Sequence, residues 1–209
     1  PPGRTPVVTR TISDARRAEL LQRMRSQISE GRQVYWVCPL IEESEALDLS
    51  NATETHQQLT QALNTDPAQP VLVGLLHSRM PQAEKNAVMA LFTSGAMAVL
   101  VSTTVIEVGV DVPNASLMVI EHAERFGLSQ LHQLRGRVGR GSAASVCMLM
   151  YSLGENGRLS DTAAARLRAM VDTSDGFEIA QRDLELRGPG EFLGARQSGV
   201  PMLRFADMQ

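Results

Sequence analysis

The sequence has a single lysine, Lys85, and contains no Asp-Glu dipeptide. A phosphate-binding P-loop follows the pattern G-x-x-x-x-G-K-[ST], whereas Lys85 lies in QAEKNA with no glycine at the required positions. Glu121, at the end of the apolar run LMVIE, is a poor substitute for the paired acids that hold magnesium and activate water. The sequence therefore lacks two parts that a complete ATP-hydrolysing site requires.

Cysteine is scarce, and the two cysteines, Cys38 and Cys147, lie in the apolar runs WVCPL and SVCML. We expect reduced cysteines in the core rather than a disulfide or a metal pair. The four histidines have no metal-ligand spacing with them, so the sequence predicts no metal site. The formal net charge is -3, and any nucleic-acid binding must therefore come from local clusters of positive charge.

The sequence also lacks a membrane-spanning or secretory segment. Residues 87–106 carry no charge over twenty residues, but TSG and STT interrupt them. We expect a helix, a glycine stop and a buried strand there. The beginning, PPGRTPVVTR, lacks the charged head and apolar core of a signal peptide. We therefore expect a cytoplasmic protein with no membrane partner.

Short apolar runs rich in β-forming residues alternate with amphipathic segments along most of the sequence. After an extended start at 1–12, strands are predicted at 33–40, 71–76, 97–103, 116–121 and 145–151. Helices are predicted at 14–31 with Ser13 as the cap, 51–63, 81–94, 128–140 and 160–173. This alternation indicates an α/β fold with a mostly parallel sheet and helices on both faces. Such sheets bind ligands at the carboxyl ends of their strands.

The composition of the chain changes at about 152–158, SLGENGR. Beyond this point, helical stretches are interrupted by glycine and proline, which predicts an appendage of helices and an ordered loop. We therefore divide the chain into a first domain, 1–152, and a helical hairpin with a loop, 153–209.

The segment QLHQLRGRVGRG, residues 130–141, concentrates arginine and glycine. On a helix, positions i, i+3, i+4 and i+7 form one face, here Gln133, Gly136, Arg137 and Arg140. Arginine presents planar, permanently charged donors that suit phosphate oxygens, and glycine allows close approach. This face therefore predicts a phosphate-binding site. The alternatives are a solvated basic helix end and a dinucleotide site, whose glycine order is reversed here.

Two motifs, about twenty residues apart, carry a family resemblance. Q-x-x-G-R-x-G-R, residues 133–140, resembles motif VI of superfamily 2 helicases, and STTVIEVGVDVPNA, residues 102–115, resembles their motif V. Residues 33–47 and 175–199 are similar to segments of the DNA helicases that migrate branched junctions, to which the transcription-repair coupling translocases are related. The resemblance covers nearly the whole chain and implies a second RecA-like helicase domain followed by a translocation motif.

The resemblance implies nucleotide roles for residues of both motifs. Arg140 would be the arginine finger on the γ-phosphate, and Arg137 would assist it. Gln133 would help to couple the nucleotide to the DNA side. Gly109 would let the backbone approach the nucleotide, and Asp111 would accept hydrogen bonds from the ribose. Without the resemblance, the motif V segment fits a tight strand-to-helix turn equally well.

The resemblance also implies contacts with DNA phosphates. Thr103 would offer its hydroxyl and its backbone N–H to a phosphate. His77 and Arg79, in GLLHSRMP, are candidate phosphate ligands at a strand end. Related sequences commonly have glycine where Ser78 stands, and a capped loop is an equal alternative for His77.

Three residues of the tail match the translocation motif, in which a helical hairpin and a loop transmit the nucleotide state to DNA movement: Arg166, Arg187 and Gln197. Arg166 borders an apolar stripe, so we expect it to pack as well as to pair. We expect Arg187, at the start of the glycine-rich loop RGPGEFLG, to be buried against carboxylates or carbonyls.

The resemblance finally implies cofactors and partners. ATP and Mg²⁺ would be bound mainly by a preceding RecA-like domain, which with a wedge domain would belong to the same protein. The substrates would be DNA forks and Holliday junctions in bacterial, nucleoid-associated recombination and repair. We expect an ATP-dependent DNA helicase whose C-terminal piece alone hydrolyses little ATP. The alternatives are a transcription-repair coupling translocase and a non-catalytic nucleic-acid-binding module.

Overall fold

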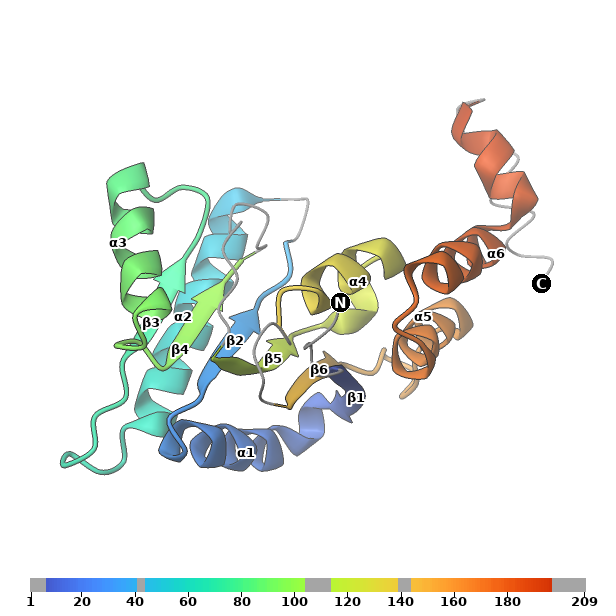
Figure 1. Ribbon diagram of the computed structural model, residues 1–209. Helices are drawn as coiled ribbons and strands as arrows, with labels where there is room; N and C mark the ends of the chain where they lie inside the picture. The colour runs from blue at the N-terminus through green and yellow to red at the C-terminus, as the bar shows by residue number, and fades with distance from the viewer. Residues whose placement is uncertain (1–6, 41–43, 104–113, 139–143, 197–209) are drawn as a thin grey trace.

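The computed structural model describes residues 7–40, 44–103, 114–138 and 144–196. They form a six-stranded sheet in the order β1-β6-β5-β2-β4-β3, and all paired neighbours run parallel (Figure 1). The strands are β1 (Val7–Ser13), β2 (Gln33–Val37), β3 (Val73–Leu76), β4 (Val99–Ser102), β5 (Ala115–Ile120) and β6 (Ser145–Tyr151). Every residue of the central strands β2 and β5 is buried. The α/β fold predicted from the sequence is therefore confirmed.

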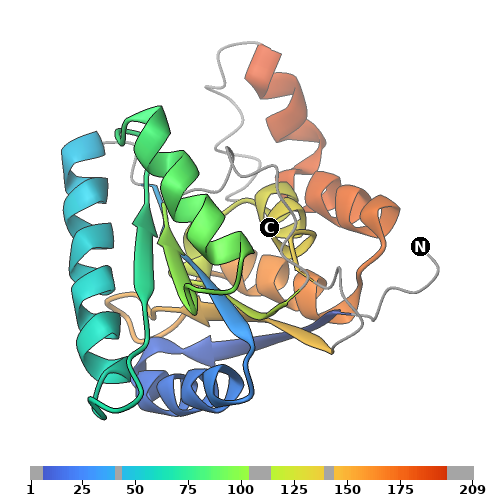
Figure 2. The same cartoon turned by 60° about the vertical axis from the view of Figure 1, so that its left-hand side comes forward.

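The described residues also form helices: α1 (Arg17–Ser29), α2 (Glu45–Leu63), α3 (Gln82–Thr93), α4 (Leu128–Arg135), α5 (Asp161–Asp172) and α6 (Gly176–Arg196), with short 3-10 helices η1 (Asp14–Arg16) and η2 (Ala123–Arg125). Because side chains alternate along a strand, Trp36 and Tyr35 of β2 enter two different apolar clusters. The Trp36 cluster includes side chains of α1 and α2, and the Tyr35 cluster includes side chains of α3, α4 and α5. Helices therefore cover both faces of the sheet (Figure 2).

Helices α5 and α6 form a hairpin on the β1 side of the sheet, away from α3 and β3 (Figures 1 and 2). The cap predicted at Ser160 is confirmed, since its hydroxyl accepts a hydrogen bond of 3.1 Å from the backbone N–H of Ala163. Where the sequence predicts a loop, α6 has helical backbone on both sides of a break at Gly188, whose φ of 75° and ψ of 156° suit glycine. Among the described residues, no helix combines the length and the apolar character needed to cross a membrane.

The start of α2 differs from the sequence prediction. The helix begins at Glu45 rather than near residue 51, because the hydroxyl of Ser44 accepts a hydrogen bond of 3.1 Å from the backbone N–H of Leu47. This side-chain cap satisfies one of the donors that an exposed helix start leaves without a partner.

The end of α4 also differs, and this difference affects the candidate site. The helix ends at Arg135 rather than at residue 140, and Gly136 is its C-cap. The backbone N–H of Arg137 bonds to Leu134 O at 3.0 Å, three residues back, so the chain tightens into a turn. The prediction that Gly136 and Arg137 continue one helical face with Gln133 is therefore wrong.

Candidate functional site

Within the part of the chain that the structure describes, Arg137 and the candidate DNA residues lie toward opposite ends of the strands. His77 and Arg79 follow β3 and Thr103 follows β4, at the edge where the strands end. Helix α4 leaves that edge after β5 and η2, and the chain then returns to the start of β6, which runs parallel to β5. Arg137 therefore lies toward the edge where the strands begin, away from the carboxyl ends at which the sequence predicts ligands.

The nucleotide side is described only in part. Gln133 is exposed on α4, and Arg137 is half-buried in the turn that follows. The predicted residues Gly109, Asp111 and Arg140 lie outside the described residues, as does the coupling residue Gln197.

The loop after β3 is held by its own side chains. Nδ1 of His77 accepts a hydrogen bond of 3.1 Å from the backbone N–H of Arg79, which leaves the proton of the neutral ring on Nε2. Burial lowers the pKa of His77, which favours this neutral form. Nε of Arg79 lies 3.9 Å from Glu45 Oε2 at the start of α2, and both side chains are exposed. The two alternatives for His77, a loop cap and a phosphate ligand, therefore do not exclude each other, because the cap uses Nδ1 alone.

Thr103 is less accessible than the sequence predicts. It is 4% exposed, and its backbone N–H already donates a hydrogen bond of 3.2 Å to the carbonyl of Leu76. That bond extends the pairing of β4 with β3 by one residue. The prediction that this N–H is offered to a DNA phosphate is therefore wrong, and the predicted role of Thr103 is left to its hydroxyl.

Arg135, at the end of α4, is 4% exposed, and the sequence motifs assign it no role. Its Nη1 donates to Thr9 Oγ1 at 3.1 Å in β1 and to the carbonyl oxygen of Met170 at 2.6 Å in α5. Its Nη2 lies 3.0 Å from Nδ1 of His132, one turn back on α4. Burial lowers the pKa of the Arg135 guanidinium. Its position seven residues after Leu128, which begins the buried face of α4, is a signal that could have indicated burial.

The hairpin contacts η2, which precedes α4, through Arg166. Its Nη2 donates a hydrogen bond of 2.8 Å to the carbonyl oxygen of Glu124 in η2, which joins α5 to the segment that precedes α4. Burial lowers the pKa of this guanidinium. The expectation that Arg166 both packs and pairs is therefore met, with a backbone carbonyl as its partner.

The other coupling residue of α6 lies on the surface. Nη2 of Arg187 is 3.1 Å from Asp183 Oδ2, one turn earlier on the same helix, and the Arg187 side chain is 58% exposed. The prediction of a carboxylate partner is correct, but the prediction of burial is wrong, because Asp183 is 16% exposed whereas the guanidinium that reaches it from the next turn remains mostly exposed. Asp183 in turn accepts a hydrogen bond of 3.4 Å from the hydroxyl of Ser129 in α4. The two helices of the hairpin therefore bond to η2 and α4, that is, to residues 123–135.

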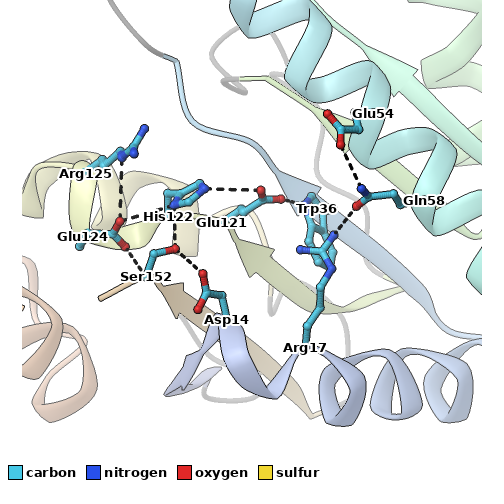
Figure 3. A network of polar contacts seen from close by, with 10 residues as sticks. All are labelled: Asp14, Arg17, Trp36, Glu54, Gln58, Glu121, His122, Glu124, Arg125 and Ser152. Atoms are coloured by element: carbon cyan, nitrogen blue, oxygen red, sulfur yellow. Dashed lines mark hydrogen bonds and ion pairs between the residues drawn. The ribbon is translucent and has the colours of Figure 1, made fainter. Parts of the chain in front are cut away.

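A network of polar side chains lies at the carboxyl ends of β5 and β6 (Figure 3). The hydroxyl of Ser152 donates to Asp14 Oδ2 at 2.7 Å, and it lies 3.0 Å from His122 Nδ1, which therefore carries the proton. His122 has a φ of 52°, in the left-handed region that few residues other than glycine adopt. Glu121 accepts a hydrogen bond of 2.8 Å from Nε1 of Trp36.

A pocket of 410 Å³ opens beside this network and has side chains of both charges, with Arg17 and Arg125 opposed by Glu54 and Glu121. The two signs offset each other, so the pocket lacks the concentrated positive charge that phosphate binding requires. Among the described residues, no group of three histidine, cysteine or acidic side chains is arranged to hold a metal ion.

Two known families match separate parts of the chain. Residues 15–142 match the family described as the helicase conserved C-terminal domain. The chain belongs to this family of helicase domains. Residues 173–209 match the C-terminal part of domain 3 of the ATP-dependent DNA helicase RecG, and RecG is the protein that the chain resembles over its full length.

Three relatives show how far this similarity extends. The chain is 59% identical to the ATP-dependent DNA helicase RecG of Acidithiobacillus ferridurans, 57% identical to that of Escherichia coli K12 and 46% identical to that of Bacillus subtilis. Each match covers 100% of this chain but 29% of the relative. The chain thus spans less than a third of the length of these relatives.

Solved structures agree with the fold. A structure described as RecG bound to a three-way DNA junction superposes with a TM-score of 0.73 and 43% identity over 92% of this chain and 24% of that one. Yeast Dbp5 bound to RNA superposes over 88% of this chain and 45% of that one, with a TM-score of 0.52 and 15% identity, which is similarity of fold alone.

Proposed function

We propose that this chain is the C-terminal motor half of an ATP-dependent DNA helicase that acts on forks and Holliday junctions. In the intact protein, a further RecA-like domain would supply the P-loop and the acidic residues that hold ATP and Mg²⁺, and a wedge domain would contact the branched DNA. The observation that carries the proposal is the similarity to RecG helicases over 100% of the chain. We place this helicase in bacterial recombination and repair, in the cytoplasm at nucleoid DNA.

We assign the contacts with ATP to the end of α4 and to motif V. Arg140 would bring its guanidinium to the γ-phosphate with help from Arg137, while Gly109, Asp111 and Gln133 would contact the nucleotide. A guanidinium supplied in this way stabilises the charge of the transferred phosphoryl group and is worth about 10³-fold or more in rate. Mg²⁺, when bound, neutralises charge on the β- and γ-phosphates.

We assign the contacts with DNA to the opposite edge of the sheet. His77 would donate from its Nε2–H, Arg79 would donate from its guanidinium, and Thr103 would use its hydroxyl. The ion pair of Arg79 with Glu45 is long, at 3.9 Å, and both side chains are exposed, so a phosphate can replace the carboxylate at little cost.

We divide the chain functionally at about residue 152, into a RecA-like domain of residues 1–152 and a translocation hairpin of residues 153–209. Arg166, Arg187 and Gln197 would transmit the nucleotide state to the DNA. The bond from Arg166 to Glu124 supports this role, because it connects α5 directly to the segment that leads into α4. Closure of the two RecA-like domains would bring the arginines onto ATP, and opening after hydrolysis would withdraw them.

ATP hydrolysis by the full-length protein tests the proposal. We expect Arg140→Ala to abolish DNA-stimulated ATPase while DNA binding is retained, because only the guanidinium that would stabilise the transferred phosphoryl group is removed. Arg158→Ala, at an exposed arginine of the loop after β6, is the matched control and should leave the ATPase unchanged. Helicase-like ATP turnover by this chain alone, or normal ATPase in Arg140→Ala, would contradict the proposal.

A further inference from the structure

Arg135 is a buried cation whose partners come from three elements. Its guanidinium bonds to Thr9 of β1, to His132 of α4 and to Met170 of α5, and the acceptors are a hydroxyl, a ring nitrogen and a carbonyl oxygen. These partners are neutral, so none of the described bonds of Arg135 supplies an opposite charge to offset the cost of removing this cation from water. A methionine or leucine would fill the same space without that cost. The arginine is therefore better explained by the bonds it makes than by packing.

The bond to Met170 has a specific geometry. Met170 lies in the last turn of α5, where carbonyl groups have no partner within the helix. Nη1 of Arg135 approaches this carbonyl to 2.6 Å and so places a positive charge at the negative end of the helix dipole. Arg135 thus acts as a C-terminal cap of α5 that is supplied by α4.

The turn that carries Arg137 directly follows Arg135 and is hydrogen-bonded to it. The backbone N–H of Val138 bonds to the carbonyl of Arg135 at 3.3 Å, and Val138 is fully buried. Arg137 lies between these two buried residues, so its backbone follows the position of Arg135. A shift of α5 relative to the sheet would pull on this turn through the bond between Arg135 and Met170.

We propose that Arg135 is a positioning residue that couples the turn of Arg137 to the end of α5, so that nucleotide-driven movement reaches the translocation hairpin. This inference rests on the proposed helicase function. It predicts that loss of Arg135 separates ATP hydrolysis from DNA movement, whereas a purely structural role would lower both in proportion. The role differs from that of Arg166, which contacts η2 before α4 rather than the end of α4.

The experiment compares Arg135→Met and Arg135→Lys with the matched surface control Arg158→Met in the full-length protein. The measured quantities are kcat and KM for ATP, and the number of base pairs unwound per ATP on a synthetic DNA fork. We expect Arg135→Met to retain most of its ATPase while unwinding per ATP falls about tenfold, a typical size for energetic coupling between sites. Lysine keeps the charge but reaches fewer acceptors, so Arg135→Lys should recover part of the unwinding.

A second variant tests the inference if Arg135→Met does not fold. Thr9→Val removes one acceptor of Arg135 with little change in volume and should lower unwinding per ATP in the same direction, by a smaller factor. Unwinding per ATP equal to the unmodified protein in Arg135→Lys and Thr9→Val, or a proportional loss of ATPase and unwinding, would overturn the inference. Failure of the helicase proposal itself is distinguishable, because the unmodified full-length protein would then neither hydrolyse ATP nor unwind the fork.

Discussion

Nη2 of Arg166 lies 2.8 Å from the carbonyl oxygen of Glu124 and donates a hydrogen bond to it. Nε of the same guanidinium is buried and has no hydrogen-bond partner among the described residues. The side chain therefore loses hydration at two nitrogens, and one described bond offsets that loss. Such an arrangement contributes little to stability, which is consistent with a role in transmitting movement between η2 and α5.

We therefore expect Arg166→Met to change the free energy of unfolding of the chain by less than about 1 kcal/mol. Urea denaturation followed by circular dichroism measures this value, with the exposed Arg168→Met as the control. In the full-length protein, the same substitution should lower the base pairs unwound per ATP. A loss of stability above about 2 kcal/mol would show instead that the bond between Arg166 and Glu124 is mainly structural.

The loop after β3 predicts a salt-dependent contact with DNA. We expect Arg79→Ala to weaken duplex binding by this chain and to reduce the slope of log Kd against log salt by about one, because one phosphate contact is lost. Fluorescence anisotropy over a series of salt concentrations measures the slope. Arg158→Ala, at an exposed arginine elsewhere, should leave it unchanged. Equal slopes for Arg79→Ala and the unmodified chain would exclude Arg79 from the interface.

His132 predicts a stability that depends on pH. Burial and, secondarily, the positive charge of Arg135 lower the pKa of His132, while Asp175 opposes the shift. At a pH between the lowered pKa of the folded state and the ordinary value of about 6.5, the unfolded chain binds more protons than the folded chain. The contribution of His132 to stability is therefore complete above about pH 6.5 and decreases as the pH is lowered through about 6.5. Asn at this position keeps an acceptor for Arg135 but does not titrate.

We therefore expect the unmodified chain to lose more stability than His132→Asn when the pH is lowered from about 7.5 to about 5.5. Urea denaturation at several pH values measures both profiles, and His77, whose pKa is also lowered, contributes equally to each. Parallel profiles would show that the bond between Arg135 and His132 does not depend on the protonation of the ring.

The two cysteines predict slow chemical modification of the folded chain. Cys38 and Cys147 are buried and free. Burial raises the pKa of both thiols, that of Cys147 to about 12, so little reactive thiolate forms at neutral pH. Labelling with a disulfide reagent at pH 8 should be at least about 100-fold slower in the folded chain than in urea. Rapid labelling of either thiol without urea would contradict this packing.

Elements whose signals are local are the predictable part of this fold. The strand predicted at 145–151 agrees with β6 because an uninterrupted apolar run specifies it, and α5 begins after the predicted cap Ser160. Apolar periodicity does not indicate the early start of α2, because two buried positions in its first half, Asp48 and Thr55, are polar. The order of the strands depends on contacts between distant segments, such as β1 with β6, which no local pattern contains.

The candidate site is less predictable, because its residues act through partners that are distant in sequence. The spacing of Gln133 and Arg137 indicates a shared face only if the helix continues, and the turn at Gly136 ends it. The pairing of Thr103 N–H with Leu76 depends on the register of two strands, which the residues around Thr103 do not specify. Arg135, which contacts β1 and α5, occupies an unspecified position of the motif, directly before Gly136.

The complete burial of β2 and β5 has a mechanical consequence. A tightly filled interior has low compressibility, so the centre of the sheet resists deformation. If the proposed helicase function is correct, a displacement at the edge assigned to the nucleotide would be transmitted through the sheet with little loss to the edge assigned to DNA. The bending during each ATP cycle would then take place where this domain joins its neighbours.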